Sequence, residues 1–459
     1  MYRKLFLGIL SIALLQSAVA CSSGTAPTAT STLVSEPATS TPASNVVSPA
    51  TPSAEMTLPV APESARVDLI KPSFSNPTNV TNPLYPISKL QQIVLLGKVE
   101  GRPFRSEVTL LPGTKEINWD GQTTKTLISQ YVAYIDGRIV EAAHDWYAQA
   151  NDGAVWYFGE DVFNFKDGVI ADTEGTWLAG KDGPAAMIMP ANPRVGDVYR
   201  VENIPGLVFE EVTVKSTGVI VDGPHGPVKG TMVGDQLHMD GTHADKTFAP
   251  GYAEFVTGKG ADIEAVALAI PTDALSGSMP TELKSLSTEA YSIFETAKLE
   301  DWPVASDTLG KMTTAWGTYK AGNNVPKLLS AQMSEALDAL TGAVKAQNSA
   351  LAWQAALGVA QASLDFQLQY RPPTEIDLAR FDLWTRQLLR DAAAGDLGAV
   401  KGDVATLEYI QDRVAHTLGS DAGRIATLVE DLRAAADAKD LSAAINVTVR
   451  LRDVPRLKQ

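Results

Sequence analysis

The sequence predicts a multi-domain α+β protein in which an antiparallel β-sheet domain precedes an all-α bundle of helix hairpins. Two observations support this fold class. Short alternating apolar runs broken by Gly-containing turns fill residues 81–272, whereas Ala and Leu recur at three-to-four spacing over residues 279–459. A third observation concerns residues 1–80, where an apolar run ending at a cysteine precedes a stretch rich in Ser, Thr, Pro, Ala and Val. We therefore divide the chain into residues 1–20, 21–80, 81–272 and 279–459.

The N-terminus predicts export. A short basic start precedes an apolar run from Leu5 to Leu15, which is the pattern of a secretory signal peptide. The run is shorter than the roughly 20 apolar residues that a membrane-spanning helix needs. It closes on Ala18-Val-Ala-Cys21, which resembles the lipobox of bacterial lipoproteins, although most lipoboxes carry Leu at the first position. The resemblance implies cleavage before Cys21, lipidation of its thiol, and stable anchoring through two or more acyl chains.

The cysteine count agrees with a lipid anchor. Cys21 is the only cysteine among 459 residues, so disulfides and thiolate metal sites are excluded for the rest of the chain. An ordinary signal peptide with a chance cysteine is the alternative. Because Ser22, rather than Asp, follows the cysteine, a Gram-negative host is expected to place the protein on its outer membrane, facing the periplasm or the surface. A Gram-positive host would offer a single membrane.

Charge and composition narrow the function. The formal net charge of −15 argues against nucleic acid, whose binding depends on basic contacts to phosphate. Residues 22–80 cannot bury enough apolar surface to offset their conformational entropy, so we expect an extended, disordered tether. Its physical role would be to let the folded part stand away from the bilayer.

Three hairpins are predicted in the β domain. The Asp136-Gly137 and Asp167-Gly168 pairs and the Asn151–Gly153 turn each separate two alternating apolar runs, and Asp-Gly is a strong hairpin signal. Further strands are expected over residues 208–221. The result should be an antiparallel sheet that forms an open half-barrel, a closed barrel or a sandwich.

The helical domain shows an internal repeat. Asp301, Asn348, Asp396 and Asp440 recur after 47, 48 and 44 residues. Each is well placed to cap a helix by accepting hydrogen bonds from its free N–H groups. This pattern predicts four helix–turn–helix units, or about eight helices. Any Ala-rich antiparallel bundle shows a similar periodicity, which is the alternative explanation. Between residues 365 and 380, alternating Asp and Arg side chains predict a salt-bridged helix junction.

One cluster has metal-ligand character. His238 and His243 flank a Met-Asp-Gly-Thr segment, and His225 lies nearby in the sequence. Imidazole with thioether would suit copper, and imidazole with Asp240 or Asp245 would suit zinc. The spacing matches no strong motif, and solvated loop histidines are the simpler alternative. No other cofactor is expected.

Aromatic side chains are dense in the central hairpin. A concave sheet lined by them would make a surface for an apolar ligand or a protein partner. The alternative is that they form the core of the sheet. The residues concerned are Trp146, Tyr147, Trp156 and Tyr157.

Catalytic signatures are weak. Neither a nucleophile elbow nor a Ser-x-x-Lys motif occurs in a suitable context, and the sequence holds no phosphate loop or dinucleotide fingerprint. A pair of carboxylates suited to glycoside hydrolysis stays an open alternative, because among 53 acidic residues some pairs will have a suitable spacing by chance. We therefore expect a non-enzymatic binding or scaffold lipoprotein of the cell envelope. A periplasmic copper- or zinc-binding lipoprotein is the alternative, and a hydrolase comes third.

The β domain also carries a family resemblance. Lys246-Thr-Phe-Ala-Pro-Gly-Tyr-Ala-Glu-Phe255 resembles the final strand and turn of a group of uncharacterised bacterial envelope β-proteins with an Ala-Pro-Gly motif. Asp145–Gly159 is similar to their central hairpin, and Pro193–Asp197 fits a later turn. Ala253 stands where a second Gly is usual. The resemblance covers about residues 81–260 and implies a half-barrel-like sheet, with no activity to carry over.

Overall fold

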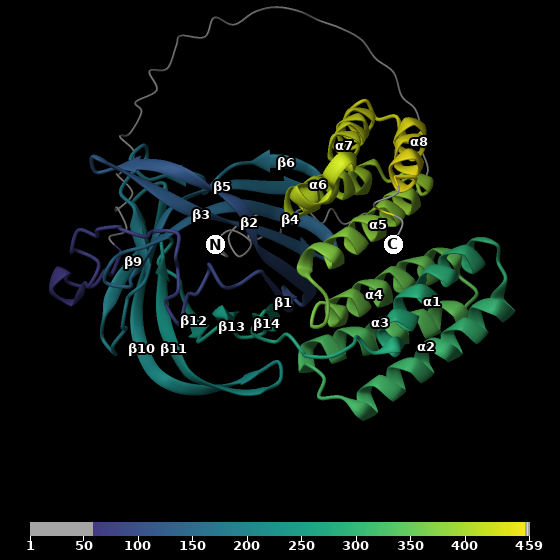
Figure 1. Cartoon of the computed structure of the whole chain (residues 1–459), viewed down its shortest axis with the longest axis horizontal. Helices are drawn as coiled ribbons and strands as arrows, with labels where there is room; N and C mark the ends of the chain where they lie inside the picture. The colour runs from purple at the N-terminus through teal and green to yellow at the C-terminus, as the bar shows by residue number, and fades with distance from the viewer. Residues whose placement is uncertain (1–57, 455–456, 458–459) are drawn as a thin grey trace, which may run out of the picture. The chain divides into compact units, whose positions relative to one another are not determined.

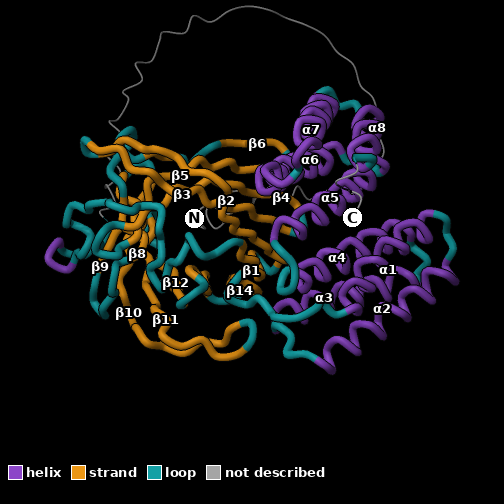
Figure 2. The backbone as a smooth tube through the Cα atoms, in the orientation of Figure 1, coloured by secondary structure: helices purple, strands orange, loops and turns teal. Residues whose placement is uncertain are grey.

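A computed structural model describes residues 58–454 and 457 (Figure 1). Contacts divide the chain after Pro59, and the description below concerns the unit from Val60 onward. The expected signal peptide, Cys21 and most of the expected tether therefore lie outside the described residues. In the described part, strands come first along the chain and helices follow, as the orange and purple segments of Figure 2 show. The predicted α+β class is confirmed.

All fourteen strands of the described residues belong to one antiparallel sheet. Its order is β6-β5-β4-β3-β2-β1-β14-β13-β12-β11-β10-β9, with β7 and β8 both paired to β5. The strands are β1 (Gln92–Val99), β2 (Arg102–Trp119), β3 (Gln122–Ile135), β4 (Arg138–Gln149), β5 (Val155–Lys166), β6 (Val169–Asp172), β7 (Trp177–Leu178), β8 (Ala186–Met189), β9 (Val198–Ile204), β10 (Val208–Gly223), β11 (Gly226–His238), β12 (His243–Ala249), β13 (Ala253–Lys259) and β14 (Asp262–Ile270).

The expected hairpin turns are present. Asp136 and Gly137 connect β3 to β4 with φ values of 50° and 72°, and Asp167 and Gly168 connect β5 to β6 with 51° and 74°. Two consecutive residues with positive φ define the turn whose twist matches that of antiparallel strands. Local turn chemistry therefore sets the order of these strands in the sheet.

The sheet curves strongly. β8 pairs with β5 near one end of the strand order and packs beside β9, which is the last strand at the other end. The curvature gives the sheet an inner and an outer face. On β1, Ile93 and Leu95 join the inner core, whereas Val94 between them joins the core shared with the helices. This arrangement agrees with the half-barrel that the sequence predicts.

A chain segment fills part of the inner face. Val80, Leu84, Tyr85, Ile87 and Leu90 are buried in the inner core. The segment just before them is also ordered against the sheet, since the backbone N–H of residue 61 donates to Glu211 and the ring of residue 74 packs on Phe158. Residues 60–80, assigned above to a disordered tether, thus belong to the folded unit. Sequence composition missed them because their few apolar side chains are spread among prolines, serines and asparagines.

Eight helices among the described residues form four antiparallel hairpins, α1/α2, α3/α4, α5/α6 and α7/α8. The second helix of each hairpin begins after the predicted Asp or Asn, whose side chain accepts a hydrogen bond from the backbone N–H three residues later. The predicted repeat of capped hairpins is confirmed. The helices are α1 (Thr281–Lys298), α2 (Trp302–Gly322), α3 (Lys327–Lys345), α4 (Ser349–Gln367), α5 (Pro373–Ala393), α6 (Leu397–Val414), α7 (Ala422–Asp437) and α8 (Leu441–Arg452).

Candidate functional site

An acidic cluster lies on the inner face of the sheet. Neighbouring strands place their inward-pointing carboxyls at similar heights, because side chains on directly paired residues share a face. Electrostatic interactions link the members across the sheet, for example Asp145 to Glu202 and Glu160 to Glu202. We call this set the inner carboxyl cluster, and its members are Glu141, Asp145, Glu160, Glu202, Glu210, Glu254 and Glu264.

Asp145 and Glu160 form the centre of this cluster. They are directly opposite each other on β4 and β5 and are 1% and 4% exposed. The Tyr157 hydroxyl donates to Asp145 Oδ1 over 2.7 Å. Burial raises the pKa of Asp145 to about 7. Burial, with the charges of Glu202 and Asp145, raises the pKa of Glu160 well above its usual range. Both carboxyls therefore hold protons at pH values where surface acids are ionised.

Basic and amide side chains contact two other members of the cluster, Glu210 and Glu254. His238 Nδ1 lies 3.3 Å from Glu210 Oε1, and Gln236 donates to the same carboxyl. Lys246 Nζ lies 3.3 Å from Glu254 Oε2. These contacts pair Glu210 and Glu254 with neighbouring side chains.

The pKa of Asp145 predicts how stability depends on pH. An aspartate in the unfolded chain titrates near ~3.9, whereas the folded pKa is about 7. Between these values the folded state binds more protons than the unfolded state, so stability is greatest below the unfolded pKa and falls as pH rises through the folded pKa. We expect the urea midpoint to decrease between about pH 5 and about pH 8. Asp145→Asn should flatten this decrease, whereas Asp136→Asn on the surface should leave it intact; equal slopes in both variants would contradict the assignment.

The four aromatic candidates lie in the core. Trp146, Tyr147, Trp156 and Tyr157 are each at most 4% exposed and belong to the inner core. The Tyr147 and Tyr157 rings stack with centroids 4.9 Å apart, and Trp177 meets Tyr157 edge-on at 5.3 Å. These four residues therefore form part of the core of the sheet, which was the alternative, and they are not an exposed surface for a ligand or partner.

The three histidine candidates do not come together. His225 lies in the turn between β10 and β11, whereas His238 and His243 flank the turn at the opposite end of β11. A strand of 13 residues at about 3.3 Å per residue puts roughly 40 Å between the two ends. His243 Nδ1 instead contacts Asp235 Oδ2 at 2.9 Å. In residues 58–454, no group of three or more His, Cys, Asp and Glu is arranged to hold a metal ion.

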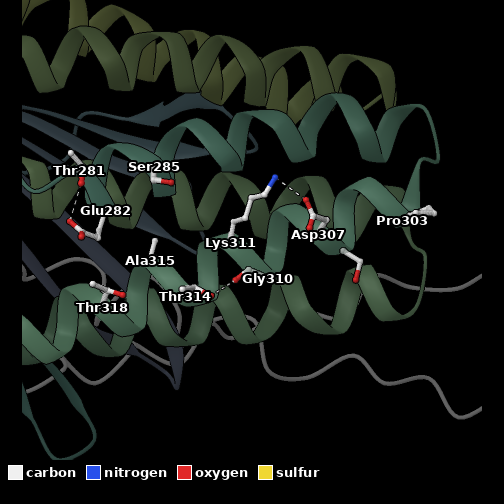
Figure 3. Close-up of a pocket in the computed structure, with 11 residues that line it drawn as sticks. Thr281, Glu282, Ser285, Pro303, Asp307, Gly310, Lys311, Thr314, Ala315 and Thr318 are labelled. Atoms are coloured by element: carbon white, nitrogen blue, oxygen red, sulfur yellow. Dashed lines mark hydrogen bonds and ion pairs between the residues drawn. The ribbon is translucent and has the colours of Figure 1, made fainter.

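A second candidate site is a groove between α1 and α2 (Figure 3), with a volume of about 1070 Å³. Hydroxyl groups and small residues dominate its lining, including Ser285, Ser306, Gly310 and Thr314. Lys311 and Asp307 form a 2.8 Å ion pair along it, and both side chains are exposed. Figure 3 shows Ser285 on α1 and the side chains of Asp307, Lys311 and Thr314 on α2. The groove offers polar contacts to a partner but no buried charge.

A third polar cluster joins the outer face to the helices. Arg380 donates to Asp365 and Asp377 over 2.8 and 3.0 Å, as the predicted helix junction required. The cluster also reaches β2, because Arg105 Nη1 contacts Asp365 at 2.7 Å and Arg413 Nη1 contacts Glu107 at 2.5 Å. Three arginines and three acids balance in this sheet–helix ion cluster, consisting of Arg105, Glu107, Asp365, Asp377, Arg380 and Arg413. Its balanced charges fit a structural role.

No protein-family model and no curated protein matches the chain. Within residues 58–454, none of the helices is both long and apolar enough to span a bilayer.

Proposed function

We propose that this protein is a cell-envelope lipoprotein, anchored through lipid on Cys21, that acts as a non-enzymatic binding protein. The feature that carries the binding role is the inner carboxyl cluster. Its acids lie on rigid strands beside aromatic rings, and Asp145 and Glu160 are almost completely buried. Burial of ionisable groups costs free energy unless a compensating partner is present. Several buried carboxyls on one face therefore support a binding role.

The envelope location rests on the sequence. The apolar run and the lipobox-like residues 18–21 support export and lipidation, and Ser22 favours the outer membrane in a Gram-negative host. The α1–α2 groove supports a scaffold role as well, since it presents hydroxyl groups to a protein partner. The binding role is preferred because the groove lacks buried polar groups that would need a ligand.

The lipid anchor gives a direct test. Cys21→Ser removes the thiol that would carry the lipid, so we expect the protein to move from the membrane fraction to the soluble envelope fraction. Fractionation with immunoblotting measures this shift, and metabolic labelling with a fatty acid should lose its signal in parallel. Ser22→Ala is the matched control and should stay membrane-bound. Persistence of the Cys21→Ser protein in washed membranes would refute the anchor.

A further inference from the structure

We propose that a pocket between α7 and α8 binds a phosphate group, either free or as part of a lipid headgroup. This inference goes beyond the proposed function, because the pocket lies in the helical domain and is basic rather than acidic. The two helices form the last hairpin of the chain (Figure 1). The pocket has a volume of about 310 Å³, and its lining consists of Gly423, Arg424, Thr427, Leu428 and Arg450.

Two guanidinium groups determine the chemistry of this pocket. Arg424 lies in the first turn of α7 and Arg450 in the last turn of α8, and none of the lining residues is acidic. Two positive groups at one small pocket repel each other, and an anion between them would remove this repulsion. Guanidinium groups bind phosphate oxygens through paired, charge-assisted hydrogen bonds. The Thr427 hydroxyl can donate a further hydrogen bond to the same anion.

Arg424 differs from almost all other arginines of this acidic protein. In the part of the chain that the structure describes, its guanidinium forms neither an ion pair nor a hydrogen bond. Every other described arginine except Arg194 lies within 3.7 Å of an acidic group. The net charge of −15 means that acids are abundant in this chain. An arginine that lines a pocket and has no acid beside it is therefore available to an external anion.

Arg450 has an internal acid as a competitor for the anion. Asp431 Oδ2 lies 3.7 Å from Arg450 Nη1, and the two side chains are 46% and 62% exposed, respectively. Exposed ion pairs contribute little free energy, because solvent screens them. A phosphate that contacts both arginines can therefore displace the carboxylate from Arg450.

The size and lining of the pocket favour phosphate over other anions. A carboxylate has two acceptor oxygens, whereas phosphate has at least three, so phosphate can accept from more of the N–H groups of two guanidiniums. The volume of about 310 Å³ is roughly ten times the space of one water molecule in the liquid, which is enough for a phosphate with an attached glycerol. Gly423 leaves space beside Arg424, since a Cβ at position 423 would meet no atom within 4 Å. Leu428 is 3% exposed and belongs to the helical core, so it bounds the pocket on the core side.

The test is calorimetric titration of the purified full-length chain in a non-ionic detergent, at low and constant ionic strength because salt screens exposed charges. The ligands are sodium phosphate, glycerophosphoglycerol and sodium acetate. We expect acetate to bind about tenfold more weakly than the tighter of the two phosphate ligands. Tighter binding of glycerophosphoglycerol would support the proposal with a lipid headgroup as the source, and tighter or equal binding of inorganic phosphate would support it with free phosphate. Absence of binding by both phosphate ligands up to roughly 10 mM, or equal binding of acetate, would overturn it.

The location is tested with variants of equal charge change. Arg424→Gln and Arg450→Gln should each weaken phosphate binding about tenfold, because charge-assisted hydrogen bonds are lost. The matched control is Arg194→Gln, since Arg194 is also exposed and has no ion pair to a described residue, but lies before β9, outside the pocket. Its affinity should equal that of the unchanged protein. Equal affinities of the Arg424→Gln and Arg194→Gln variants would reject this site.

Two further variants separate a shaped pocket from general surface charge. Gly423→Leu keeps the charge but fills space in the pocket, so it should weaken binding while the helix stays intact by circular dichroism. Asp431→Asn removes the acid that competes for Arg450 and should strengthen binding about two- to fivefold. Unchanged affinity in the Gly423→Leu variant would show that phosphate does not enter the pocket, and would overturn the proposal.

Discussion

Replacement of Arg380 by methionine should lower the free energy of unfolding by about 3–5 kcal/mol. The guanidinium is 1% exposed and donates to Asp365, Asp377 and Gln92 over 2.8 to 3.0 Å. Methionine fills much of the same space but leaves two buried carboxylates with fewer compensating charges. Removal of one partner from a buried ion pair is strongly destabilising for this reason. Urea unfolding followed by circular dichroism measures the change.

A double variant separates charge from packing. Arg380→Met with Asp377→Leu removes one arginine and one acid, so the loss should be smaller than the sum of the two single losses. Lys311→Met is the control, since the Lys311–Asp307 pair is exposed on α2, and surface ion pairs contribute little. Additive losses in the double variant would show that the sheet–helix ion cluster does not act as a unit.

Local signals in the sequence predicted much of this fold. Asp301, Asn348, Asp396 and Asp440 each cap a helix, because a cap depends on the residue itself and the three that follow. The Asp-Gly pairs likewise predicted where strands end, because the positive φ of a hairpin turn depends on the turn residues themselves. Both kinds of prediction use only neighbours along the chain.

Features that depend on distant residues were not predictable in the same way. Arg105 and Asp365 are 260 positions apart, and nothing near either residue identifies its partner. The inner carboxyl cluster was also missed, because its members are single acids on separate strands and meet only when the sheet curves. The alternation of apolar and polar residues could have suggested inward acids such as Asp145. The strand register that brings it opposite Glu160 contains one irregularity, however, and no sequence pattern marks it.

The segment that precedes β1 gives the second large expected effect. Tyr85→Ala should lower the free energy of unfolding by about 3–5 kcal/mol, as for other buried aromatic truncations. The Tyr85 ring is 6% exposed and packs edge-on against Tyr147 at 5.4 Å, with Phe248 at 6.3 Å. Its removal would leave a cavity on the inner face of the sheet that neighbouring strands cannot collapse to fill. Chemical unfolding of the full-length chain measures the loss.

Ile70→Ala is the control from the same segment, since its side chain is 78% exposed and should tolerate truncation within about 0.5 kcal/mol. A similar small effect for Tyr85→Ala would mean that residues 60–90 are only loosely packed on the sheet. A large effect would mean that the chain leading from the proposed anchor enters the core itself. The membrane attachment would then connect directly to the strands that carry Asp145 and Glu160, through the contact of Tyr85 with Tyr147 on β4. The position of this segment would thus be coupled to the geometry of the inner carboxyl cluster.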